Sequence, residues 1–110
     1  MLSRVLKKYA SHVYVAATPA EAKSILRDHS VNFVVCDFNL GEEAPSGVEL
    51  IEDLRGEFSG IERAVIFSGE DRGSIPPSPT TDQVLHKTQD LEQLCDLIRQ
   101  SAKAHRVFEI

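Results

Sequence analysis

Hydrophobic residues along the chain alternate between short apolar runs, typical of buried strands, and the three-to-four-residue spacing typical of amphipathic helices. The strand-like runs are His12–Ala17, Val31–Cys36, Ala64–Phe67 and Val84–His86. The segments with helical spacing are Leu2–Tyr9, Pro19–Leu26, Val48–Phe58 and Leu91–Ile98. This alternation predicts an α/β domain with right-handed crossovers and a parallel sheet that helices cover on both faces.

Helix starts are marked by capping residues. The segments Thr18–Glu21 and Ser46–Glu49 both have the form of a capping box, which predicts a helix start at each. Thr88 is expected to cap the last helix, with Asp90 in its first turn. Between the last two strands, Gly73–Asp82 carries three prolines, and a regular helix is not expected there because proline removes amide donors.

Composition limits the classes of function. The 110 residues fit one domain, 1–110, and the net charge of -5 argues against a nucleic-acid partner. The apolar runs are too short to span a bilayer, and the charged Arg4, Lys7 and Lys8 argue against a signal peptide, so we expect a cytoplasmic protein without a membrane partner. Cys36 and Cys95 lack metal-ligand spacing and are expected to be packed, reduced thiols.

Three predicted strands end in polar residues, namely Asp37, Ser68 and Lys87. Because the carboxyl ends of parallel strands meet at one edge of the sheet, we expect these side chains to converge. A carboxylate can attack phosphorus, a hydroxyl can donate a hydrogen bond to phosphoryl oxygens, and an ammonium can neutralise their charge. The set therefore points to phosphoryl transfer, for which a divalent cation would be the missing component.

The segments Cys36–Leu40 and Ser46–Leu50 resemble the receiver domains of two-component response regulators, and the resemblance covers nearly the whole chain. It implies a flavodoxin-like, doubly wound parallel sheet and a role in phosphorelay signalling. The chain would not be an enzyme beyond self-catalysed phosphoryl transfer. Its partner would be a histidine kinase or another signalling protein.

The resemblance also implies site residues. Asp37 would be the phospho-acceptor, and Asp37 together with the backbone carbonyl of Asn39 would contact Mg²⁺. Ser68 and Lys87 would contact the phosphoryl group. Glu70 would modulate the rate at which that group is lost.

Several features depart from the receiver pattern. The family's first strand, whose acidic pair holds magnesium, should precede Leu2–Tyr9, so we expect the Mg²⁺ site to be weak or absent. Val84 stands where a switching aromatic residue is common, Thr88 follows Lys87 in place of the usual proline, and the proline-rich segment replaces most of the fourth helix. These departures favour an interaction module that is rarely phosphorylated, whereas the intact Asp37 keeps open a conventional receiver phosphorylated by a histidine kinase.

A missing central strand would leave unpaired backbone groups in the sheet. The alternating tail Arg106–Ile110 is a candidate to fill the gap, either within its own chain or in a homodimer by strand exchange. Glu109 would then bring a carboxylate near Asp37. The other interpretation is a frayed terminus or the last turn of the preceding helix.

Two enzyme classes are alternatives to the receiver. A haloacid-dehalogenase-type phosphatase would also use Asp37 as nucleophile, but it expects an Asp where this chain has Asn39. A Ser-His-Asp hydrolase built from Ser68, His86 and Asp37 lacks the nucleophile-elbow sequence. The loop pair at 42–43, two glutamates, is either a solvated loop or a replacement for the lost acidic ligands.

Overall fold

The computed structural model describes residues 2–100 and 106–110 and contains a five-stranded sheet in which every pairing is parallel. Its strands are β1 (His12–Val15), β2 (Phe33–Cys36), β3 (Arg63–Ser68), β4 (Gln83–His86) and β5 (Arg106–Glu109). The helices are α1 (Leu2–Leu6), α2 (Pro19–Asp28), α3 (Gly47–Glu57) and α4 (Leu91–Gln100), with a short 3-10 helix η1 (Arg72–Ser74). The predicted α/β class and parallel sheet are confirmed.

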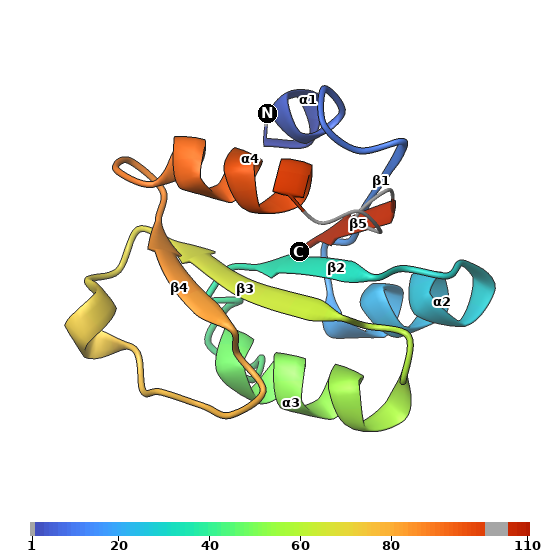
Figure 1. The fold of residues 1–110 in the computed structure, drawn as a ribbon. Coiled ribbons are helices and arrows are strands. Elements are labelled where there is room, and N and C mark those ends of the chain that lie inside the picture. Colours follow the sequence, from blue (N-terminus) through green and yellow to red (C-terminus); the bar gives the residue numbers. More distant parts are fainter. Residues whose placement is uncertain (1, 101–105) are drawn as a thin grey trace.

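The C-terminal strand β5 lies inside the sheet, between β1 and β2, in the order β1-β5-β2-β3-β4 (Figure 1). Val107 pairs with Val13 on one side and with Phe33 on the other. Val107 and Phe108 are both 0% exposed, so burial of these two side chains explains why the tail forms a strand. The chain's own tail therefore forms a central strand, and the interpretation as a frayed terminus is wrong.

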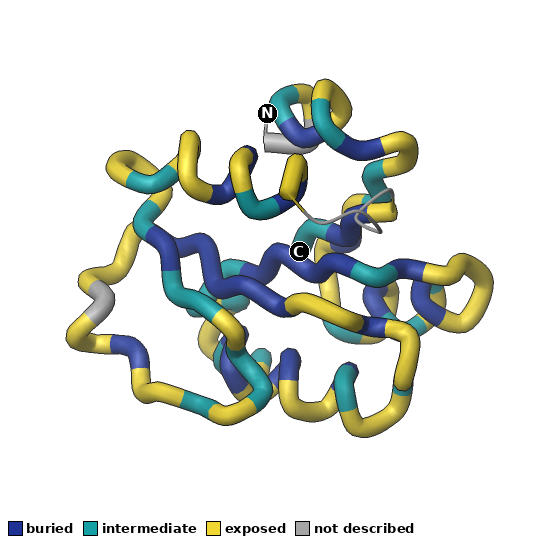
Figure 2. Tube along the Cα trace, viewed as in Figure 1, coloured by how far each residue is buried: buried dark blue, intermediate teal, exposed yellow. Residues whose placement is uncertain are grey.

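Helices α2 and α3 lie on one face of the sheet, and α1 and α4 lie on the other (Figure 1). Side chains at alternate strand positions point to opposite faces and so pack against different helices. Val34 and Phe108 belong to the hydrophobic cluster under α2 and α3. Val35 and Val107 belong to the cluster under α1 and α4. Both faces of the sheet are therefore covered, and strands β2 and β3 are buried along nearly their whole length (Figure 2). The edge strand β1 has no buried residue.

The two predicted capping boxes lie at helix starts. The Ser46 hydroxyl accepts from the amide of Glu49, whose carboxylate accepts in return from the amide of Ser46. The Thr18 hydroxyl accepts from the amide of Glu21 at 3.1 Å. Both predicted starts are confirmed.

The predicted cap of the last helix is wrong. Helix α4 begins at Leu91, and the Thr88 hydroxyl instead lies 2.9 Å from Nδ1 of His86. Asp90 precedes the helix, and its carboxylate accepts from the His86 amide at 2.8 Å. The side chains of Thr88 and Asp90 therefore stabilise the turn between β4 and α4.

The proline-rich segment forms no α-helix, as expected; η1 is its only helical part in the described chain. Its far end is held by Arg55, whose guanidinium donates to the carbonyl of Thr80 and to the carboxylate of Asp82. Ile75 is buried against the core and anchors the near end. The segment is therefore a fixed irregular connection.

Two further expectations concern cysteines and membranes. Cys36 and Cys95 are buried free thiols, as expected, and burial raises the pKa of Cys36 to about 12. Among the described residues, no helix combines the length and the apolar character needed to cross a membrane.

Candidate functional site

Asp37, Ser68 and Lys87 lie at the carboxyl edge of three neighbouring strands, β2, β3 and β4. The side chains of Asp37 and Lys87 meet, with Nζ 2.6 Å from Oδ2. The amide of Lys87 donates to the carbonyl of Ser68 at 2.9 Å. The structure therefore brings together three residues that are up to 50 positions apart in the sequence.

The Asp37 carboxylate is held in its ionised form. Burial raises its pKa, but the Lys87 ammonium, the amide of Asn39 and the hydroxyl of Ser68 together lower the pKa of Asp37 below its ordinary value. The Asn39 amide donates to Oδ1 at 3.3 Å. At neutral pH this group is a charged acceptor at the sheet edge, as a nucleophile toward phosphorus requires.

Ser68 and Glu70 occupy different environments. Ser68 is 1% exposed, and its hydroxyl accepts from the amide of Glu70 at 3.2 Å. The side chain of Glu70 is exposed. Glu70 therefore lies on the surface beside the site.

Gly47 lies against the backbone of Asp37. The sequence pattern indicates Gly47 only as part of a helix start. A Cβ at Gly47 would lie 2.1 Å from the carbonyl oxygen of Asp37. The amide of Gly47 donates to the carbonyl of Phe38 at 2.7 Å. Only glycine permits α3 to approach the end of β2 this closely, so Gly47 fixes where Asp37 stands.

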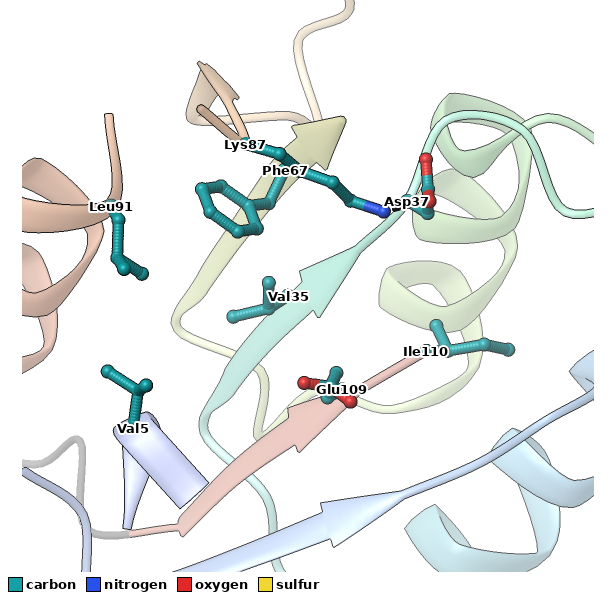
Figure 3. A pocket seen from close by; sticks show the side chains of 8 residues that line it. All are labelled: Val5, Val35, Asp37, Phe67, Lys87, Leu91, Glu109 and Ile110. Carbon is teal, nitrogen blue, oxygen red and sulfur yellow. Dashed lines mark hydrogen bonds and ion pairs between the residues drawn. The ribbon is translucent and has the colours of Figure 1, made fainter. Parts of the chain in front are cut away.

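The C-terminal strand contributes a second carboxylate. Glu109 is paired in register with Val35, and the amide of Asp37 donates to the carbonyl of Ile110 at 2.9 Å. Glu109 and Asp37 both line a pocket of about 480 Å³ beside the sheet edge (Figure 3). Burial raises the pKa of Glu109, and its Oε1 has no hydrogen-bond partner among the described residues.

The other candidates are not joined to this site by side-chain hydrogen bonds. His86 is paired in register with Ser68, but its Nδ1 contacts Thr88, and no side-chain hydrogen bond found among the described residues links His86 to Ser68 or Asp37. Glu42 and Glu43 are exposed in the loop after β2. Within residues 2–100 and 106–110, no three His, Cys, Asp or Glu side chains group closely enough to hold a metal ion.

Comparisons of the chain with protein-family models, with curated proteins and with solved structures found no match. The function must therefore be argued from the site and the fold.

Proposed function

We propose that this chain is a receiver-like signalling domain that acts through protein–protein interaction, with Asp37 at the phospho-acceptor position. The observation that carries the proposal is the 2.6 Å contact between Asp37 and Lys87, beside Ser68, at the carboxyl edge of a parallel sheet. Ligands of open α/β sheets bind at this edge. A histidine kinase or another cytoplasmic signalling protein is the proposed partner.

The sheet order supports the same proposal. The order β1-β5-β2-β3-β4, with helices on both faces, is compatible with a flavodoxin-like fold. In it, β5 lies between β1 and β2, the central place where the resemblance would put a first strand, and Glu109 is the last residue of β5. On this proposal, the C-terminal strand stands in for the first strand of the receiver pattern.

Mg²⁺, which the resemblance implies, fits this site poorly. Asp37 Oδ2 already holds the Lys87 ammonium. The neighbouring Glu109 stands beside the apolar side chains of Val35 and Phe67, whereas Mg²⁺ keeps several of its water ligands and demands near-octahedral geometry. We propose that Mg²⁺ binding is weak, with Lys87 as the cation of the site, and that Asp37 is rarely phosphorylated.

A conventional receiver is the second candidate, because the acceptor geometry is intact. In that case the ionised Asp37 would attack the phosphorus of a donor, the bond to the donor's leaving group would break, and the leaving group would depart with the electron pair. Lys87 and the hydroxyl of Ser68 are placed at the edge that would receive the phosphoryl oxygens.

Affinity capture separates these two candidates. The immobilised wild-type and Asp37→Asn proteins would be exposed to a lysate of the source cells, with and without acetyl phosphate, and retained proteins would be quantified. We expect the same proteins in the same amounts under all conditions. Capture that requires acetyl phosphate and is lost in Asp37→Asn would instead favour the conventional receiver.

A phosphatase of the haloacid-dehalogenase type is the weakest candidate. Position 39 carries an asparagine, whose side-chain oxygen accepts from the amide of Gly41 at 3.2 Å. No general acid is present there to protonate a leaving group. We expect turnover of para-nitrophenyl phosphate to equal that of Asp37→Ala; a higher wild-type rate would contradict this expectation.

A further inference from the structure

The pocket beside Asp37 is walled mainly by hydrocarbon. Val35 and Phe67 form its floor on the sheet, and Val5 of α1 and Leu91 of α4 stand at its opposite side (Figure 3). Leu91 is 38% exposed, one of two large hydrophobic residues left open to solvent in the described chain. A volume of about 480 Å³ lies within the range of pockets that hold small organic molecules.

The polar groups of the pocket have an unbalanced charge. Asp37 and Lys87 neutralise each other at 2.6 Å. No ion pair found between described residues includes Glu109, and its Oε1 is buried without a hydrogen-bond partner among them. A buried acceptor left unpaired costs free energy, so a ligand that donates to Glu109 is favoured.

We propose that this pocket binds a small organic amine, whose ammonium donates to Glu109 and whose hydrocarbon body packs against Val35, Phe67 and Leu91. An organic cation matches both the carboxylate of Glu109, which lines the pocket, and the apolar walls, whereas a hydrated metal ion matches only the carboxylate. A carboxylate ligand is disfavoured because the ammonium of Lys87 is already paired. This inference goes beyond the signalling role and does not depend on phosphorylation of Asp37.

The first test varies the ligand. 2-Phenylethylamine would be titrated into the full chain at neutral pH and followed by protein NMR. Two controls test the two parts of this ligand separately. 3-Phenylpropionate has a similar hydrocarbon body but carries a negative charge, and ethylamine has the ammonium group without the aromatic ring. We expect saturable binding of 2-phenylethylamine and binding weaker by about tenfold or more for both controls. Equal or tighter binding of 3-phenylpropionate, or no saturable binding of the amine, would overturn the proposal.

The second test varies the protein. Glu109→Gln removes the charge while keeping the side-chain shape, and we expect it to weaken amine binding by about tenfold, whereas the matched change Glu42→Gln in an exposed loop leaves binding unchanged. Because Glu109 is in a central strand, thermal unfolding of each variant is recorded. Leu91→Ala, at the partly exposed start of α4, removes apolar contact without touching the sheet and should also weaken binding. Unchanged affinity in a folded Glu109→Gln variant contradicts the assignment.

Discussion

Asp37 depends on its neighbours for its charge state. Its pKa is raised by burial and lowered, to a greater extent, by Lys87, Asn39 and Ser68. Since the folded-state pKa lies below the ordinary value of 3.8, ionised Asp37 stabilises the fold above about pH 4. That contribution is lost as the pH falls through the folded-state pKa.

Lys87→Met should therefore raise the pKa of Asp37, because burial would then be opposed only by the amide of Asn39 and the hydroxyl of Ser68. The Lys87 side chain is 46% exposed, so we expect the free energy of unfolding at neutral pH to fall by less than about 1 kcal/mol. Carboxyl NMR titration of both proteins measures the shift, and Asp37→Asn assigns the signal. An unchanged pKa of Asp37 in Lys87→Met would refute this account of the site.

Gly47 offers a second test with a control in the same helix. Gly47→Ala would place a Cβ 2.1 Å from the Asp37 carbonyl oxygen, and we expect a loss of roughly 1 to 3 kcal/mol in the free energy of unfolding. A Cβ at Gly56 meets nothing within 4 Å, so Gly56→Ala should be neutral or stabilise by up to about 1 kcal/mol. Urea unfolding compares the two. Equal effects would show that α3 does not depend on this close approach.

At the scale of elements, β5 connects the two parts of the sheet. Among the described strands, β1 pairs with β5 alone, whereas β2, β3 and β4 pair in succession. Removing β5 would therefore detach β1 and expose edge groups of β2 to solvent. The stability of the fold and the position of Glu109 thus depend on the same short strand.

Deleting residues 106–110 should abolish cooperative thermal unfolding. A milder change, Phe108→Ala, should cost about 3–5 kcal/mol because this side chain is fully buried. Arg106→Ala, an exposed position in the same strand, serves as control and should change stability by less than about 0.5 kcal/mol. Light scattering reports the oligomeric state in parallel. A deletion variant with an unchanged melting temperature would contradict the central placement of β5.

For the whole molecule, the sequence predicts the features that depend on local residue patterns, such as the strands, the helices and the polar residues at the strand ends. Asp37, Ser68 and Lys87 were expected to converge because hydrophobic runs end directly before each of them and parallel strands share an edge. The capping box at Ser46 likewise depends on a local pattern, and the structure contains it.

Features that depend on tertiary packing could not be predicted in this way. The sequence does not decide whether the tail is a strand or a frayed end, since four strand residues carry little local signal and their position between β1 and β2 decides the outcome. Thr88 has the side chain of a helix cap, but its contact with His86 depends on the turn geometry, which the sequence does not show. The sequence does not predict the pocket, because its lining residues come from helices and strands that only the folded chain brings together.

The proposal that Asp37 is rarely phosphorylated is tested most directly by the mass of the intact protein after incubation with acetyl phosphate and Mg²⁺. The ammonium of Lys87 is paired with the carboxylate of Asp37, and the site fits Mg²⁺ poorly. We therefore expect both the wild-type protein and Asp37→Asn to keep the mass of their unmodified forms. A gain of one phosphoryl group in the wild type that is absent in Asp37→Asn would contradict the account and establish Asp37 as a working phospho-acceptor.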